Sequence, residues 1–273
     1  MNELQLKEVE LLKVFIDICE KNKLKYYLVC GTALGAVKYK GFIPWDDDID
    51  VAMPREDYEL FCTYAPHQIP EKYFLQTHKT ESEFRAIYAK LRDSSTTFIE
   101  SSVVDMNINH GINIDIFPLD GYPQRKKEQC FLEFRKKIYV FILSLPNKRH
   151  SRYKEMIIKP LRFFFSKKTY DRVIEKYEKM IKNYCISSSE IIANHGNWQG
   201  KLDYSDRSVF GNGIVYKFEG LDVIIPSNYD AYLRKKYGDY EKDLPVDKQK
   251  SHHIFSVIDV RKPYSYYIDN LKT

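Results

Sequence analysis

Four aspartates lie within five residues of the chain, in Trp45-Asp46-Asp47-Asp48-Ile49-Asp50-Val51. If residues 48–53 form a β-strand, Asp48 and Asp50 share one face, because side chains alternate along a strand. Two neighbouring carboxylates repel each other, which raises a pKa or requires a cation. A hard divalent ion with oxygen ligands meets that requirement. The sequence therefore predicts Mg²⁺, with Mn²⁺ as an alternative, held by catalytic Asp48 and Asp50.

A third carboxylate is expected from a neighbouring strand. Asp115 lies in Gly111-Ile112-Asn113-Ile114-Asp115-Ile116, and an acid among apolar strand residues is rarely buried unless it is paired or metal-bound. We expect Asp115 to bind the ion or to act as general base, and the alternative is a capped carboxylate in the core. Asp46 is expected at the entrance of the site, and Asp47 in a solvated loop.

The spacing of Asp46, Asp48 and Asp50 also matches the first half of a calcium-binding EF-hand loop. In that loop the sixth position is Gly and the twelfth is Glu. Here Val51 and Asp57 stand at those positions. The pattern therefore does not favour a calcium loop.

Phosphate-binding groups are predicted near these acids. Gly31 and Thr32 lie between a predicted strand and a predicted helix, where Gly admits a ligand to the backbone and free N–H groups attract phosphate. Lys90 and Arg92 flank the predicted site strand and are expected to hold phosphate oxygens. The alternative for both is a solvated charge on an edge strand.

Two histidine segments have two interpretations each. His252 and His253 precede an apolar run at 254–258. In one interpretation His252 contacts phosphate or the acceptor; in the other, the two histidines are a surface pair whose hydrogen bonds are satisfied. His195 lies in the polar loop 194–198, where a ligand contact is one interpretation.

The hydrophobic pattern predicts an α+β protein, with a mixed β-sheet core, flanking helices and a helical second half. Predicted strands are 25–30, 48–53, 84–91, 96–100, 112–117 and 221–225, and predicted helices are 3–21, 33–38, 54–64, 124–143, 151–184 and 227–237. We expect strands 84–91 and 96–100 to pair around a turn at 93–95, Thr32 to cap a helix, and Pro118 to close a strand. This arrangement suggests a catalytic core at 1–120 and a basic, helical acceptor-binding region at 121–273 that completes the site.

The 273 residues carry a net charge of +5 that is unevenly spread. Between residues 125 and 182 there are 18 Lys and Arg against 6 Asp and Glu. Phe131, Phe134, Phe141 and residues 163–165 accompany this charge, a pattern that suits an anionic membrane surface or an anionic acceptor. A solvated helical face is the alternative. A nucleic-acid-binding module is disfavoured, because clustered carboxylates add nothing to polyanion binding.

The hydrophobic pattern of the sequence predicts neither a membrane span nor a signal peptide. No run reaches the roughly 18 apolar residues that span a bilayer, and the first residues lack the apolar stretch of a signal peptide. The five cysteines are odd in number and widely spaced, without C-x-x-C. These features predict a cytoplasmic protein, peripheral on the inner membrane face.

Several blocks of the sequence resemble the LicD family. They are residues 27–37 with 41–53, residues 115–120, and the later segments 225–226, 232–233 and 237–240 with Pro245 and His252. The resemblance is dense over 26–120, sparse over 121–185 and moderate over 190–253. Fukutin and fukutin-related protein share the central motif and are similar enzymes that use CDP-ribitol, but this sequence has neither an evident cysteine zinc site nor a transmembrane anchor.

The resemblance implies a nucleotidyltransferase-like fold and a LicD-type CDP-alcohol phosphotransferase. The donor is then CDP-choline or a similar CDP-alcohol, and the acceptor a teichoic-acid, lipopolysaccharide or other glycan precursor. A choline headgroup favours an aromatic cage, for which Tyr26, Tyr27, Trp45 and Trp198 are candidates. The alternative activity is an NTP-dependent nucleotidyltransferase acting on a small molecule.

Overall fold

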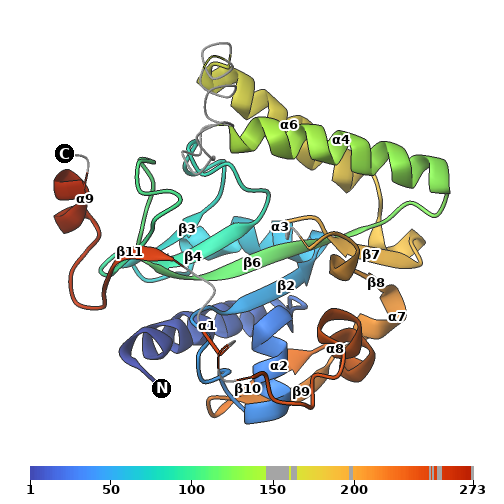
Figure 1. Cartoon of the computed structure of the whole chain (residues 1–273), viewed down its shortest axis with the longest axis horizontal. Helices are drawn as coiled ribbons and strands as arrows, with labels where there is room; N and C mark the ends of the chain where they lie inside the picture. Colours follow the sequence, from blue (N-terminus) through green and yellow to red (C-terminus); the bar gives the residue numbers. More distant parts are fainter. Residues whose placement is uncertain are drawn as a thin grey trace.

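The computed structural model describes residues 1–145, 160, 165–196, 199–245, 247, 249–250 and 254–271. A mixed β-sheet forms its centre, and helices α4 and α6 lie side by side along one flank (Figure 1). The helices are α1 Glu3–Asn22, α2 Cys30–Tyr39, α3 Arg55–Tyr64, α4 Lys126–Ser144, α6 Lys167–Lys182, α7 Arg207–Phe210, α8 Tyr229–Tyr237 and α9 Ser265–Leu271. The strands are β1 Tyr27–Leu28, β2 Asp50–Pro54, β3 Tyr73–Gln76, β4 Ala89–Asp93, β5 Thr97–Glu100, β6 Ile112–Gly121, β7 Ile191–Asn194, β8 Tyr204–Asp206, β9 Ile214–Phe218, β10 Leu221–Ile225 and β11 Phe255–Asp259. Short 3₁₀ turns are η1 Ala65–His67, η2 Ile186–Ser188 and η3 Gly200–Asp203.

The central sheet has seven strands, in the order β1-β2-β6-β4-β3, with β7 paired to β6 and β8 paired to β7. Strand β2 runs parallel to β6, whereas the other pairs are antiparallel. Two further ribbons, β9–β10 and β5–β11, complete the β-structure of the described residues. The predicted α+β class is therefore confirmed.

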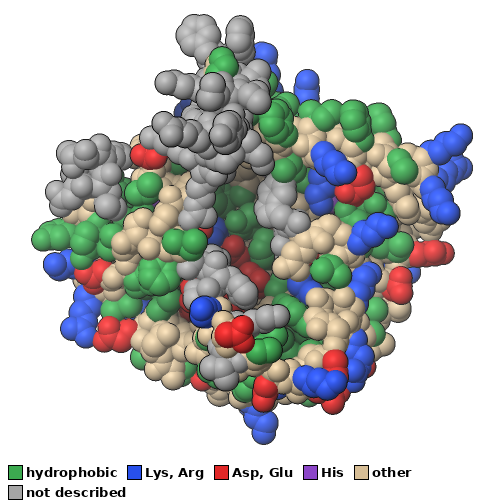
Figure 2. Space-filling view, in the orientation of Figure 1, with side chains coloured by type: hydrophobic (Ala, Val, Ile, Leu, Met, Phe, Trp, Pro, Cys, Tyr) green, Lys and Arg blue, Asp and Glu red, His purple; other side chains and the backbone are tan. Residues whose placement is uncertain are grey.

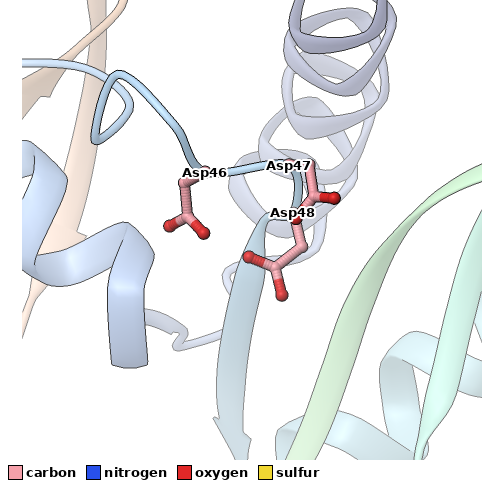
Figure 3. A group of neighbouring side chains, drawn as sticks. All are labelled: Asp46, Asp47 and Asp48. Atoms are coloured by element: carbon pink, nitrogen blue, oxygen red, sulfur yellow. The ribbon is translucent and has the colours of Figure 1, made fainter. Parts of the chain in front are cut away.

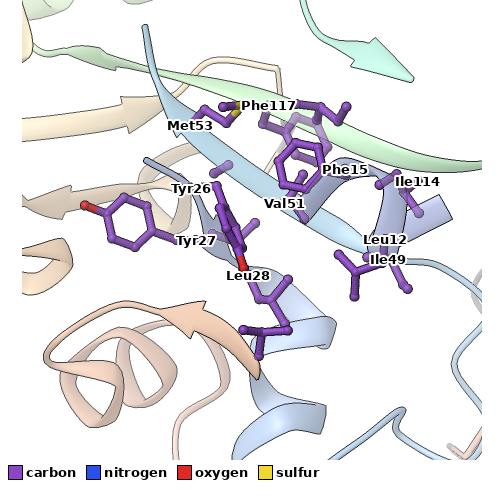
Figure 4. Close-up of a cluster of buried hydrophobic side chains, with 14 of the residues drawn as sticks. Leu12, Phe15, Tyr26, Tyr27, Leu28, Ile49, Val51, Met53, Ile114 and Phe117 are labelled. Atoms are coloured by element: carbon purple, nitrogen blue, oxygen red, sulfur yellow. The ribbon is translucent and has the colours of Figure 1, made fainter. Parts of the chain in front are cut away.

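The main hydrophobic core lies between α1 and α3 and one face of the sheet (Figure 4). Helix α1 begins with a capping box between Asn2 and Gln5, and its apolar stripe packs inward. Phe15 contacts Phe61 of α3, with ring centroids 5.0 Å apart. Val51 of β2 is completely buried in the same core, so that its strand neighbours point to the opposite face.

Local patterns predicted most elements but misplaced some ends. The helices expected at 3–21, 54–64 and 227–237 and the strand at 221–225 are confirmed. The predicted strand at 48–53 begins too early, because β2 starts at Asp50 and leaves Asp48 in the preceding turn. Thr32 does not cap its helix, because α2 starts at Cys30.

The predicted pairing of strands 84–91 and 96–100 is wrong. Strand β4 pairs with β3 and β6, and β5 pairs with the distant β11. The turn itself exists, since the Ser95 N–H donates to Asp93 Oδ1 at 3.0 Å. It redirects the chain instead of closing a hairpin, because both strands find better partners far away in the sequence.

Pro118 does not close its strand, because β6 continues to Gly121. The Asp115 N–H donates to the Ile49 carbonyl, so alternation turns the Pro118 nitrogen to the other edge of β6. On that edge β4 pairs as far as Ile116 and β7 begins at Leu119. The missing N–H of Pro118 therefore falls in the gap between two partners, where no ladder bond is lost.

The region after residue 120 contributes both helices and strands. Helix α4 confirms the helix expected at 124–143, and α6 occupies the last part of the one expected at 151–184, whose residues 151–159 and 161–164 lie outside the described residues. Strand β7 hydrogen-bonds to β6, so the sheet extends across the proposed boundary at residue 120. No helix in the described parts is both long and apolar enough to cross a bilayer.

Candidate functional site

Three charged side chains form a row across the centre of the sheet. Asp50 of β2 is the register partner of Asp115 of β6, which in turn is the partner of Lys90 of β4. Register partners on adjacent strands point to the same face. Lys90 Nζ lies 3.0 Å from Asp115 Oδ1 and 3.5 Å from Glu100 Oε1. Lys90 is therefore a buried counter-ion rather than a solvated edge charge.

Asp115 is held in place by two donors. Besides Lys90, Asn113 Nδ2 donates to Asp115 Oδ1 at 2.7 Å. Burial is the largest single influence on the Lys90 ammonium and disfavours it, but Asp115, Tyr88 and Glu100 together outweigh burial and raise the pKa of Lys90 above its usual value. The ammonium consequently stays charged, and the Asp115 carboxylate has a fixed position beside Asp50.

The other three aspartates lie in the turn that leads into β2 (Figure 3). Among the described residues, Asp46, Asp47 and Asp48 form a group in which one carboxylate oxygen of each lies within 4.8 Å of the others. Gln5 of α1 fixes this turn, because its Nε2 donates to the Asp46 carbonyl at 3.0 Å. The expectation that Asp47 is solvated is wrong, since only 7% of the residue is exposed.

The chemistry of this acid group fits a hard divalent cation, which prefers carboxylate oxygens. Of the three predicted ligands, Asp48 belongs to this acid group. The other two, Asp50 and Asp115, lie on the adjoining strands β2 and β6. All four of Asp46, Asp48, Asp50 and Asp115 line one cavity. The assignment of individual ligands therefore stays a prediction, but the acids that it names are neighbours.

Gly31 and Thr32 position the acids. A Cβ atom on Gly31 would lie 2.6 Å from Asp46 Oδ2, so only glycine leaves room for that carboxylate. The Thr32 hydroxyl accepts the Asp50 backbone N–H at 2.8 Å and is buried. Gly31 lines the cavity at the start of α2, where a phosphate contact was expected, whereas Thr32 supports the strand behind it.

The cavity has a volume of about 460 Å³, with carboxylates at its floor and aromatic rings on its walls. Figure 2 shows a hollow near the centre of the surface in view, with acidic side chains deep inside it. The aromatic lining residues are Tyr39, Trp45, Tyr88, Phe117, Tyr237 and Tyr240. Of the cage candidates, Trp45 lines the cavity, Tyr26 and Tyr27 pack in the core, and Trp198 lies outside the described residues.

Negative charge accumulates around the floor of the cavity. Burial, with Asp48 and Asp115 nearby, raises the pKa of Asp50 well above its usual value. Burial and the aspartates of the turn likewise raise the pKa of Glu8, on α1, well above its usual value. Glu8 is 2% exposed, and its Oε2 has no hydrogen-bond partner among the described residues.

Glu8 was missed by the sequence analysis, although a signal was present. It stands four residues after Leu4 and four before Leu12, on the apolar stripe of α1. A carboxyl group on a buried stripe is rare unless it has a partner or a function.

Arg92 and His195 lie outside the cavity lining. Arg92 is buried, and its guanidinium donates to Gln76, Gly111 and Asn113. His195 is completely buried beside the paired rings of Tyr122 and Tyr204, and burial holds its pKa well below the usual value. Their direct contacts with substrate stay predictions, while His252 and His253 lie outside the described residues.

Gly31→Ala is expected to impair the acid site without harming the fold. The new methyl group displaces the Asp46 carboxylate, a flexible side-chain end, while alanine favours the helix by about 1 kcal/mol over glycine. Titration with Mn²⁺, followed by electron paramagnetic resonance, should show weaker binding than in the wild type, at an unchanged or higher melting temperature. Unaltered Mn²⁺ affinity would show that Asp46 does not contribute to cation binding.

Glu8→Gln is expected to remove a pH dependence of stability. Folding raises the pKa of Glu8, so the protonated carboxyl group stabilises the folded state relative to the charged one. This contribution to the free energy of unfolding is fully present below the unfolded-state pKa and is lost as the pH rises through the folded-state pKa. In EDTA, urea unfolding should therefore show the variant gaining stability relative to wild type as the pH rises above the unfolded-state pKa of a glutamate, about 4.3. Glu10→Gln, on the exposed side of α1, is the control, and a pH-independent difference for Glu8→Gln would contradict the expectation.

Comparisons with known proteins place this site in a family. The family described as "LicD/FKTN/FKRP, nucleotidyltransferase domain" matches residues 23–164, which include the acid turn, β2 and β6. The chain is 30% identical over 260 residues to the lipopolysaccharide cholinephosphotransferase LicD of Haemophilus influenzae, covering 93% of this chain and 96% of that protein. An uncharacterised protein of Rickettsia typhi is 44% identical over 57 residues, 21% of this chain and 18% of its own. The chain belongs to the LicD family.

Proposed function

We propose that this protein transfers phosphocholine, or a related phospho-alcohol, from a CDP-activated donor to a hydroxyl group of a cell-surface glycan precursor. The observation that carries the proposal is the cavity with a carboxylate floor and aromatic walls. The Haemophilus relative, a lipopolysaccharide cholinephosphotransferase by name, supports the phosphocholine and the glycan.

The acids at the floor are suited to a metal-dependent reaction. Asp46, Asp48 and Asp50 would hold Mg²⁺, or Mn²⁺, with Asp115 beside them. When bound, the cation would neutralise the negative charge of the donor pyrophosphate, which the carboxylates alone would repel. Gly31 leaves backbone N–H groups near the phosphates, at the start of α2.

Asp115 is suited to activate the acceptor. The acceptor hydroxyl oxygen attacks the phosphorus of the phosphocholine group, the phosphorus–oxygen bond to CMP breaks, and CMP leaves. Asp115 takes the hydroxyl proton as general base. Lys90, at 3.0 Å, fixes the carboxylate and keeps its charge balanced before the proton arrives. Lys90 thus acts through Asp115, without a direct phosphate contact.

The aromatic walls favour a quaternary ammonium headgroup. Trp45, Tyr88 and Tyr237 line the cavity that contains the acids, and ring faces attract such cations. Choline therefore finds both rings and carboxylates, whereas ribitol and glycerol offer hydroxyl groups that need hydrogen-bond partners. The walls support choline as the transferred alcohol.

Nucleotidyl transfer from an NTP to a small molecule is the alternative use of the same fold. It releases pyrophosphate, whereas the proposed reaction releases CMP. The aromatic walls of the cavity favour the proposed reaction, because a triphosphate tail gains nothing from tyrosine and tryptophan rings.

Incubation with CDP-choline and Mg²⁺ should release CMP, and EDTA should stop the release. Asp48→Asn and Asp50→Asn should each reduce turnover at least about 100-fold, because they remove charge that the reaction needs at the pyrophosphate. Chromatographic separation of the nucleotides measures both. CDP-ribitol and CDP-glycerol in parallel reactions report which alcohol is preferred.

The matched control is Asp222→Asn, which alters an exposed ion pair with Lys217 on the β9–β10 ribbon. It should retain wild-type turnover. Wild-type turnover in Asp48→Asn, or release of pyrophosphate from CTP in place of CMP from CDP-choline, would refute the proposed reaction.

We also propose that the protein is peripheral on an anionic membrane surface, which it contacts through α4. The exposed side of this helix carries Phe131, Phe134, Ile138 and Phe141, with 61%, 63%, 42% and 51% of each residue exposed. Figure 2 shows apolar side chains on this flank beside Lys and Arg. Apolar side chains beside exposed basic residues suit the interface of an anionic bilayer.

Sedimentation with phosphatidylglycerol vesicles tests this contact. The wild type should co-sediment at low salt and much less at high salt or with phosphatidylcholine alone. Replacing both Phe131 and Phe134 by Ser should weaken binding at least about tenfold, because two large apolar groups no longer enter the interface. Leu60→Ser, at an exposed site on α3, is the control, and equal binding by all variants would exclude α4 as the contact.

A further inference from the structure

A second cavity lies next to the acid site. Its volume is about 300 Å³, and Tyr88 lines both cavities. Lys90 lines the second cavity while its ammonium contacts Asp115, which lines the first. The two cavities therefore adjoin at Tyr88 and at the Lys90–Asp115 ion pair, and a molecule in the second would lie close to the proposed general base.

Two arginines, Arg85 and Arg92, line this second cavity, and neither forms an ion pair with an acid of the described residues. Arg92 is 2% exposed, and its recorded hydrogen bonds reach only neutral oxygens, of Gln76, Gly111 and Asn113. Arg85 stacks on the ring of Tyr170, with its Cζ 4.6 Å from the centroid. Across the described residues, neither guanidinium forms an ion pair, and Arg85 Nε has no hydrogen-bond partner.

The acids on the same wall have other contacts. Glu83 accepts the Asn107 backbone N–H at 2.8 Å, and Glu100 contacts Lys90 at 3.5 Å. Burial is the largest influence on both arginines and lowers the pKa of each below its usual value, which agrees with charge that is only partly compensated. Lys90 adds a third cation, although Asp115 and Glu100 balance it.

Buried positive charge without an acidic partner is costly, so its persistence indicates a ligand of opposite charge. Guanidinium N–H groups donate to the oxygens of a phosphate or a carboxylate. Arg92 Nε and Nη1 are already engaged, which leaves Nη2 for a ligand, whereas Arg85 Nε has no partner among the described residues. The remaining wall is apolar and aromatic, with Phe84 and Tyr88 beside Val140 and Leu143 of α4. Rings of this kind suit the carbon face of a sugar.

We propose that the second cavity is an acceptor subsite, which binds a phosphate or carboxylate group on the glycan through Arg85 and Arg92. The anion would anchor the sugar so that a neighbouring hydroxyl group reaches Asp115, past Tyr88 and Lys90. Arg92 then contacts the acceptor and not the donor phosphates. This inference rests on the proposed transfer reaction for the identity of its ligand.

Isothermal titration of the full chain with three probes tests the subsite. Glucose 6-phosphate and glucuronate carry the two candidate anions, and glucose carries neither. At least one charged probe should bind saturably and at least about tenfold more tightly than glucose. The preferred probe shows whether phosphate or carboxylate is the natural group.

Arg85→Gln and Arg92→Gln should each weaken binding of the charged probe at least about tenfold, and Arg85→Lys should lose less than Arg85→Gln. Arg172→Gln, an exposed arginine on α6, is the matched control and should bind as wild type. Melting curves verify folding, and if buried Arg92→Gln is unstable, Arg85→Gln decides. No preference for charged probes, or wild-type binding by Arg85→Gln, would overturn the subsite.

The outcome is separable from that of the proposed reaction, because probe binding needs neither donor nor turnover. A chain that releases no CMP but binds the charged probe through Arg85 retains the anion site and loses the transferase assignment. A chain that releases CMP but binds neither charged probe retains the transferase assignment and loses the subsite.

Discussion

Repulsion among closely spaced carboxylates is the constraint on which the site depends. One carboxylate oxygen from each of Asp46, Asp47 and Asp48 lies within 4.8 Å of the others, and Asp50 begins the next strand. Glu8 adds a carboxyl group from α1 behind them. Such a cluster is tolerated only if protons, cations or fixed donors compensate for it. Burial, together with the neighbouring aspartates, raises the pKa values of Asp50 and Glu8, which favours their protonated forms when no cation is bound.

The sheet provides part of the compensation through strand register. Because β4 and β6 are antiparallel partners, Lys90 lies directly beside Asp115 and neutralises it. The opposite face of β2 and β6 carries Val51 and Ile114, which are completely buried in the main core. Because side chains alternate between the two faces along each strand, one face forms an apolar core that fixes the strands and the other carries the polar row.

Helix α4 connects the site to its surroundings through two faces. Its inner face carries Leu143, which lines the second cavity, and its outer face exposes Phe134. The inner face thus lies near Arg85 and Lys90, while the outer one remains open to a larger partner. An acceptor that is both charged and anchored to a membrane would meet both features on the same helix, which gives the two proposals a common geometry.

The sequence by itself determined which residue types are available to the site and most of the local elements. The aspartate cluster, Asp115, the apolar stripe of α1 and the α+β class follow from residue type and short-range periodicity, which act within a few residues. Tertiary structure alone decided that Lys90 pairs with Asp115, that β5 joins β11 and that Glu8 lies behind the acid turn. These contacts join residues far apart in the chain, and packing of the whole core selects them. Short-range patterns do not specify which strands pair, because every strand has many candidate partners of similar local propensity.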